Sequence, residues 1–145
     1  MFEGIDVPTV GTLPTYAHSG DAGADICSSE SVTLRAGERK LVGTGVRVQL
    51  PEGIVGLLCS RSGLAHSAGV VVLNAPGIID NGYTGELKVN LFNSSKMDHL
   101  ITAGDRIAQL VIQSSVQVNF LPVAEADFTA LETERGESGH GSTGS

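Results

Sequence analysis

The chain has 145 residues, which is enough for one ordinary domain and too few for two. Its formal net charge of −7 argues against broad nucleic-acid binding, which needs a basic face, although a few cationic groups can still hold a nucleotide. No stretch approaches the ~20 apolar residues of a membrane span, and the two cysteines form no disulfide framework, so we expect a cytoplasmic protein with reduced thiols that contacts neither nucleic acid nor membrane.

Strand-like patterns follow one another along most of the chain. Apolar residues alternate with polar ones over 32–34, 46–50, 87–91 and 116–118, and shorter apolar runs occupy 54–58 and 70–73. The near-continuous apolar run over 107–112 is typical of a strand that is buried on both faces. Many short strands joined by glycine-rich turns predict an all-β fold, either a sandwich, a barrel or a jelly roll.

Helix is expected to be a minor component. Only a short turn over 62–67 and a weakly periodic segment over 124–131 have helical character, so we predict at most one short helix. From residue 132 the composition changes, and 135–145 contains no apolar anchor. We therefore divide the chain into one β domain, 1–131, and a flexible tail, 132–145.

Four polar or glycine-rich clusters interrupt the predicted strands, at 21–25, 60–65, 74–83 and 104–110. Each cluster alone is also consistent with an ordinary turn. The third contains Asp80, which follows two isoleucines and precedes Asn81-Gly82. A carboxylate there is suited to act as a general base toward water, and it is equally suited to cap a turn.

The other clusters carry groups that bind phosphate or a metal. Arg61, Ser62 and Gly63 open the short helical segment and offer a guanidinium, a hydroxyl and free backbone N–H groups, which suit a phosphate. Asp25 and Gln109 are oxygen donors of the kind that hold Mg²⁺ or its bound waters.

The order of these clusters resembles the trimeric dUTPase (deoxyuridine triphosphatase) family, whose five motifs all have counterparts here. The third is similar in the form Gly-Ile-Ile-Asp-x-Gly-Tyr-x-Gly-Glu, and the fifth in the form Arg-Gly-x-x-Gly-x-Gly-Ser-Thr-Gly. The five counterparts span nearly the whole chain, at 21–28, 61–65, 74–90, 104–110 and 135–144.

The resemblance implies a β jelly roll, or distorted β-barrel, that assembles as a homotrimer. It also implies hydrolysis of dUTP to dUMP and pyrophosphate, which controls the dUTP level and supplies dUMP for thymidylate synthesis. In this reading Asp80 activates a water that attacks the α-phosphorus in line, with Mg²⁺ as the cofactor. Each active site combines motif three of one subunit, motifs one, two and four of a second, and the tail of a third as a lid.

The resemblance also implies individual roles. Asp25 reaches the metal through water. The phosphate contacts are Arg61, Ser62, Gly63 and Gln109. The contacts to uracil and deoxyribose are Asn74, Ile78, Ile79, Tyr83 and Lys88, with Tyr83 packed under the sugar so that a 2′-hydroxyl is excluded. The tail contributes Arg135, His140, Gly141, Ser142 and Thr143.

Three positions depart from the family pattern. Ser60 stands where proline is usual, which predicts a looser loop, and Thr84 stands where arginine is common. His140 replaces a phenylalanine that stacks on uracil, and its imidazole titrates near neutral pH. Two alternatives stay open: a dCTP deaminase of the same fold, and an additional regulatory role with a protein partner.

Overall fold

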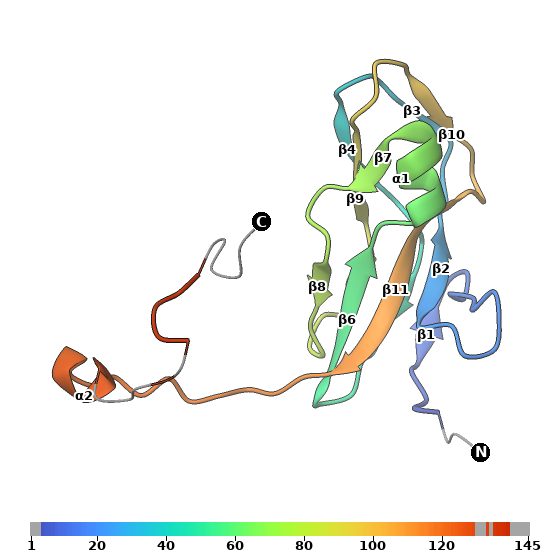
Figure 1. Cartoon of the computed structure of the whole chain (residues 1–145). Helices are drawn as coiled ribbons and strands as arrows, with labels where there is room; N and C mark the ends of the chain where they lie inside the picture. Colours follow the sequence, from blue (N-terminus) through green and yellow to red (C-terminus); the bar gives the residue numbers. More distant parts are fainter. Residues whose placement is uncertain (1–3, 130–132, 134, 140–145) are drawn as a thin grey trace.

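The computed structural model describes residues 4–129, 133 and 135–139. Short strands make up most of the regular secondary structure of this part of the chain (Figure 1). The strands are β1 (Thr9–Val10), β2 (Gly23–Cys27), β3 (Val32–Leu34), β4 (Arg39–Val42), β5 (Arg47–Val48), β6 (Ile54–Cys59), β7 (Val70–Val72), β8 (Gly77–Ile79), β9 (Val89–Asn93), β10 (His99–Ile101) and β11 (Arg106–Ser114).

All of these strands pair in the antiparallel sense. The larger sheet has the order β2-β11-β6-β8, the next has the order β4-β9-β7, and β1-β5 and β10-β3 form separate pairs. Neighbours in these sheets are mostly distant in sequence, so the chain crosses repeatedly between sheets, as in a jelly roll. The predicted all-β fold is confirmed.

The core between the sheets is aliphatic. Leu34, Val42, Val89 and Leu91 are fully buried, and the buried residues of the described ranges include no aromatic side chain. Each such side chain contributes about 1.5–3 kcal/mol through burial, so the alternating valines and leucines of the sequence hold the sheets together. The polar Asn93 is also buried, and its amide donates to the carbonyls of Leu34 and Met97.

The central strand β11 follows the apolar run that the sequence identified. Ile107, Ala108 and Leu110 are buried, and the strand pairs with β2 on one side and β6 on the other. The register with β2 shifts between Arg106 and Ala108, so β11 bulges where it enters the sheet. A bulge re-aims the side chains beside it, which here affects Arg106.

The helix α1 (Ser62–Ala68) forms where the sequence predicted it. Arg61 is its extended N-cap residue, and Gly69 ends it in the left-handed conformation at φ 66°, where its N–H reaches the Ala65 and Leu64 carbonyls. Leu64 and Ala68 pack against the core and fix the helix beside β7. This contact sets the direction in which Arg61 points.

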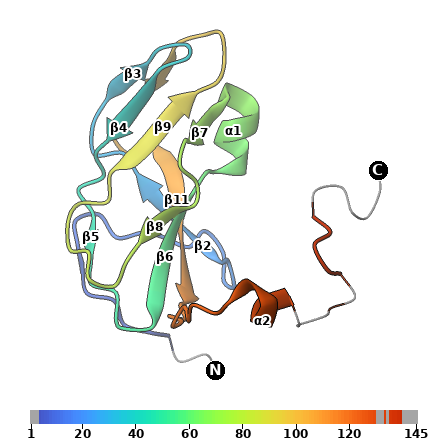
Figure 2. The same cartoon turned by 90° about the vertical axis from the view of Figure 1, so that its left-hand side faces the viewer.

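The chain leaves the β body after β11 and runs out as an extended arm, residues 115–129 (Figures 1 and 2). A second helix, α2 (Glu125–Thr129), lies on this arm, so the described chain has one helix more than expected. The predicted strand over 116–118 is wrong: both valines are exposed, Val116 at 86%, because the arm lies beside no strand of the described chain. Neither helix of the described ranges is long and apolar enough to cross a membrane.

Candidate active site

Asp25 and Gln109 face each other across two neighbouring strands. Asp25 on β2 is directly opposite Gln109 on β11, so both side chains project from the same face of the larger sheet. Their neighbours Ile26 and Ala108 point to the other face and are buried. The sheet register therefore brings together two residues that are 84 positions apart in sequence.

Two guanidinium groups bracket the Asp25 carboxylate. Arg61 Nε donates to Asp25 Oδ1 at 2.9 Å, and Arg106 Nη1 lies 3.6 Å from Asp25 Oδ2. Arg61 also donates through Nη1 to the Arg106 carbonyl at 3.3 Å. The side chains of Asp25 and Arg61 are only 16% and 27% exposed, so this charge-assisted contact is partly protected from solvent. The Asp25 carboxylate is therefore paired with two guanidiniums.

A cavity of about 360 Å³ opens over this cluster. The sequence-predicted residues that it brings together are Asp25, Arg61, Ser62, Gly63 and Gln109. Ser62 and Gly63 stand in the first turn of α1, where backbone N–H groups lack acceptors within the helix and where no acidic side chain occurs. The lining also includes the Asp21 carboxylate, so one guanidinium stands beside two carboxylates there. A guanidinium, N–H groups and a hydroxyl are groups that hold phosphates, so we call this the phosphate pocket.

The Gln109 side chain is held in the phosphate pocket from two sides. Its Nε2 donates to the Ser60 carbonyl at 2.8 Å, and a Cβ added at Gly23 would collide with its Oε1. Glycine at position 23 is therefore needed to leave room for the amide. Ser60 itself accepts the Val72 N–H through Oγ at 2.8 Å, which ties this loop to β7 in place of the constraint that a proline ring would give.

The residues of motif three lie elsewhere. A second cavity, of about 570 Å³, is lined by Leu41, Ile79, Tyr83, Glu86, Leu87 and Lys88. It brings together three of the residues that the sequence assigned to uracil and deoxyribose. The other two, Asn74 and Ile78, are exposed and line neither this cavity nor the phosphate pocket. We call this second cavity the nucleoside pocket, after the role that the family resemblance predicts for its residues.

Asp80 follows β8 directly and is exposed. Within the described chain its carboxylate has no hydrogen-bond or ion-pair partner, and only its carbonyl is engaged, by the Tyr83 N–H at 3.1 Å. The turn-capping alternative is therefore not supported by a side-chain contact. The carboxylate is available to water.

Asp80 and the phosphate pocket lie at opposite edges of the same sheet. β8 and β2 are separated by β6 and β11, which corresponds to about 14 Å at ~4.8 Å per strand. Asp80 continues β8 past Ile79, which pairs with Gly56, whereas Asp25 is level with Cys59, so the two carboxylates also differ by about 13 Å along the strands. They are roughly 20 Å apart within one chain.

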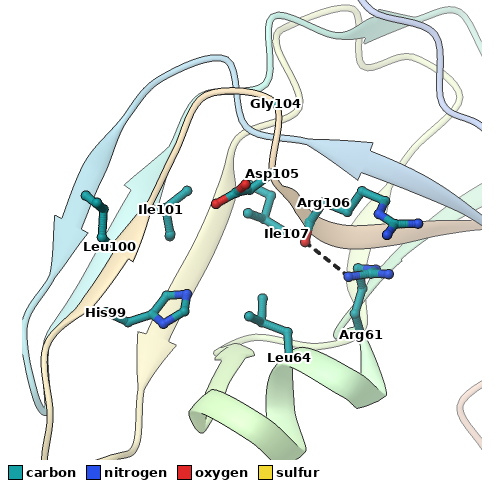
Figure 3. Close-up of a pocket in the computed structure, with 9 residues that line it drawn as sticks. All are labelled: Arg61, Leu64, His99, Leu100, Ile101, Gly104, Asp105, Arg106 and Ile107. Carbon is teal, nitrogen blue, oxygen red and sulfur yellow. Dashed lines mark hydrogen bonds between the residues drawn. The ribbon is translucent and has the colours of Figure 1, made fainter.

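A third hollow adjoins the phosphate pocket and shares Arg61 with it (Figure 3). It measures about 480 Å³, and the His99 ring, the Asp105 carboxylate and Leu64 point into it. The Asp105 carboxylate is engaged, since its Oδ2 accepts the Thr102 N–H at 2.8 Å and shapes the turn before β11. We assign no separate role to this hollow.

The tail residues are only partly described. Arg135 is described, and its Nε donates to the Ser138 carbonyl at 3.0 Å. The other predicted tail residues lie outside the described residues: His140, Gly141, Ser142 and Thr143. The described chain therefore does not bring motif five to either pocket.

Sequence reasoning assigned no role to three residues that shape these pockets. Arg106 stood inside motif four, but its approach to Asp25 depends on the bulge in β11. Glu86 stood at the end of motif three, and its anchoring contacts link it to residues 44 and 45. Leu41 had no signal at all, because a single leucine in a β-strand is ordinarily a core residue, yet here it is exposed beside Tyr83 and Lys88.

The donor set fits a hard cation only in part. The described residues contain no group of three or more His, Cys, Asp or Glu side chains that could hold a metal ion alone. Mg²⁺ is commonly bound by one or two carboxylates together with substrate phosphates and water. Asp25 and the amide oxygen of Gln109, placed beside the phosphate pocket, are compatible with that mode of binding.

Comparison of the sequence with known proteins gives a consistent result. A model of the dUTPase family matches residues 9–144. A deoxyuridine 5'-triphosphate nucleotidohydrolase of Leifsonia xyli subsp. xyli is 45% identical over 146 residues, covering 99% of this chain and 93% of that protein. The protein of the same name from Bifidobacterium longum subsp. infantis is 52% identical over 133 residues, covering 91% and 82%.

Comparison of the structure agrees. A Staphylococcus bacteriophage 80alpha dUTPase with dUpNHpp superposes with a TM-score of 0.84 at 33% identity, covering 97% of this chain and 99% of that one. A mutant dUTPase from phage phi11 of S. aureus, described as revealing the coordination of a structural Mg(II) ion, gives a TM-score of 0.78 at 31% identity, covering 83% and 98%.

Proposed function

The chain belongs to the dUTPase family, and on that premise we propose that it hydrolyses dUTP to dUMP and pyrophosphate at sites shared between the subunits of a homotrimer. The observation that carries the shared site is the separation of Asp80 from the phosphate pocket. Two groups roughly 20 Å apart cannot both reach one α-phosphorus. Two copies of the chain can, if the β8 edge of one lies against the phosphate pocket of the other.

The extended arm supports association of several copies. Val116, Val118, Phe120, Leu121 and Phe128 are all exposed, and Phe120 reaches 91%. A row of large exposed apolar side chains is typical of a surface that packs against another chain. An arm that crosses to a neighbouring subunit would bury this row and carry Arg135 and the rest of motif five to a second site. The division into a β domain, 1–131, and a closing tail, 132–145, belongs to this proposal.

The residues then have separate tasks. Arg61, Ser62, Gly63 and Gln109 hold the triphosphate, and Asp80 of another subunit takes a proton from the water that attacks the α-phosphorus in line. Fixed donors aimed at the developing charge supply most of the rate in such a displacement. Arg106 supports this set, because its carbonyl accepts from Arg61 Nη1 and, together with Asp25 Oδ1, keeps the Arg61 guanidinium oriented.

The nucleoside pocket sets the choice of substrate. Tyr83 packs under the deoxyribose, and Ile79 and Lys88 flank it. Asn74 and Ile78 complete the proposed contacts to the nucleoside. Asp25 and Gln109 would hold Mg²⁺ together with the substrate phosphates, and the cation would neutralise charge on the triphosphate. The names of the relatives favour this hydrolysis over the dCTP deaminase alternative. The supply of dUMP for thymidylate synthesis, the cytoplasmic location and a regulatory protein partner stay predictions.

Mixing two inactive variants tests the shared site. Asp80→Asn and Arg61→Ala chains are co-expressed with different affinity tags and purified through both tags. In a mixed trimer, a site that takes Asp80 from the Arg61→Ala chain and Arg61 from the Asp80→Asn chain is intact, and each doubly tagged trimer has one such site, about a third of its sites. We expect dUTP turnover to return to that order, measured as pyrophosphate release.

The matched control is each variant alone, purified through two tags in the same way. If every site were built within one chain, each site in the mixture would carry one of the two changes. Mixed trimers as inactive as the two single-variant trimers would therefore contradict the shared site and leave only intrachain catalysis.

His140 predicts a pH-dependent KM. It lies outside the described residues, and its role follows from its place in motif five. A neutral imidazole stacks on uracil, and its protonation below about pH 6.5 adds a charge and changes that contact. We expect KM for dUTP to vary between about pH 5.5 and 8 in the wild type and to be flatter in His140→Phe. Equal profiles of KM against pH for the two proteins would contradict a contact between His140 and the substrate.

A further inference from the structure

The Tyr83 ring lies directly against the backbone of Gly85. A Cβ added at Gly85 would stand 2.5 Å from Tyr83 Oη, 2.7 Å from Cζ and 3.0 Å from Cε2. Gly85 is not among the glycines with positive φ, so its backbone conformation is open to any residue. What position 85 cannot accept is a side chain, because the space is taken by the tyrosine.

The hydroxyl of Tyr83 is also fixed. Oη donates to the Glu86 carbonyl at 2.8 Å, and the Tyr83 N–H donates to the Asp80 carbonyl at 3.1 Å. The Tyr83 side chain therefore folds back over the loop between β8 and β9, and hydrogen bonds hold both its hydroxyl and its backbone N–H. It remains 45% exposed and lines the nucleoside pocket.

The loop that carries Tyr83, residues 80–88 between β8 and β9, is anchored to the segment 44–47. Glu86 Oε1 accepts the N–H groups of Thr44 at 3.1 Å and Gly45 at 2.9 Å. Arg47 Nε donates to the Thr84 carbonyl at 2.8 Å. A hydrogen bond in which one group is ionised is stronger than one between neutral groups, so both attachments are charge-assisted, and Glu86 accepts two of the three hydrogen bonds.

We propose that Gly85 and Glu86 are positioning residues that determine selection for the deoxyribose. Because Gly85 has no side chain, the Tyr83 ring can pack against its backbone. The Glu86 carboxylate holds this loop at a fixed position relative to Thr44 and Gly45. This inference rests on the proposed function, in which Tyr83 packs under the sugar. The Tyr83 ring excludes a 2′-hydroxyl only while it stays in this position, so a displaced ring admits the ribonucleotide.

The test compares Gly85→Ala with Gly82→Ala. Gly82 lies in the same loop and its φ is not positive. An added Cβ at Gly82 meets nothing within 4 Å, so Gly82→Ala is a matched control. Tyr83→Ala is the reference for a lost ring. For each protein, kcat and KM are measured with dUTP and with UTP. A merely destabilising change lowers turnover of both nucleotides and leaves the ratio of the two kcat/KM values unchanged.

We expect Gly85→Ala to lower the dUTP-to-UTP ratio about tenfold or more, toward that of Tyr83→Ala, while Gly82→Ala keeps the wild-type ratio. A ratio that falls in Tyr83→Ala but not in Gly85→Ala would overturn the positioning role and leave the proposed function intact. A ratio that is unchanged in Tyr83→Ala would remove the tyrosine from the sugar site, and with it the premise of the inference.

Two further measurements separate the role of Gly85 from that of Glu86. Glu86→Gln keeps one acceptor oxygen and is expected to keep most of the ratio, whereas Glu86→Ala is expected to lose it. The chain has two tyrosines and no tryptophan, so in a Tyr16→Phe background the fluorescence reports Tyr83 alone. Gly85→Ala should make that emission more accessible to acrylamide without substrate. Unchanged quenching would contradict displacement of the ring.

Discussion

Replacing Asp80 by asparagine will lower kcat for dUTP by about 10²–10⁴-fold, the range by which a positioned general base accelerates a reaction. An amide cannot accept the proton of the attacking water. Because the Asp80 carboxylate is exposed and has no partner within the described chain, its loss leaves no buried group unsatisfied. The free energy of unfolding should therefore change by less than about 0.5 kcal/mol.

Asp6→Asn is the matched control, because Asp6 is also exposed and lies far from β8 in sequence. It should retain the wild-type kcat. The measurements are initial rates of pyrophosphate release at saturating dUTP and urea unfolding of all three proteins. An Asp80→Asn enzyme with more than about a tenth of the wild-type kcat would exclude Asp80 as the base.

Replacing Arg61 by alanine will lower kcat/KM for dUTP by about 10²–10³-fold, the range for loss of one fixed donor to a developing charge. The same change removes the closest partner of Asp25, which is itself mostly buried and then keeps only Arg106 at 3.6 Å. We expect a loss of about 1.5–3 kcal/mol in stability, in line with a hydrogen bond to a charged group. Activity and stability therefore fall together, unlike in the Asp80 variant.

Arg61→Lys separates the two effects, because it keeps the charge and loses the planar fork that reaches Asp25 and the Arg106 carbonyl. It should lie between wild type and Arg61→Ala in kcat/KM. Arg39→Ala removes an exposed guanidinium on β4 and should change neither kcat/KM nor stability. If Arg61→Ala stays within about threefold of the wild-type kcat/KM, the phosphate pocket has been assigned to the wrong residues.

Sequence reasoning identified most residues of the phosphate pocket without showing why they meet. Asp25, Arg61 and Gln109 stood out as polar groups between apolar runs, and the predicted run over 107–112 became β11. Their meeting depends on strand register, which places Gln109 level with Asp25 and Cys59. Register is set by pairing between distant segments, and a single sequence does not display it.

The misses have related causes. β2 and β8 each contain glycine, and β1 has two residues, so their patterns are too short or too interrupted to identify. The valines over 116–118 alternate as a strand does but find no neighbouring strand in the described chain. An apolar pattern indicates that one face of a segment will be buried, and it does not identify the chain that buries it.

The most direct measurement is pyrophosphate release from dUTP, with dTTP, dCTP and UTP alongside, in Mg²⁺ and then in EDTA. We predict Mg²⁺-dependent turnover of dUTP and little turnover of the other three nucleotides. In the proposed function the nucleoside pocket selects uracil and deoxyribose, and the cation offsets the charge of the triphosphate in a phosphate pocket that is lined by two carboxylates and one guanidinium. A well-folded protein that leaves dUTP intact, or that releases ammonia from dCTP instead, would contradict the proposed hydrolysis.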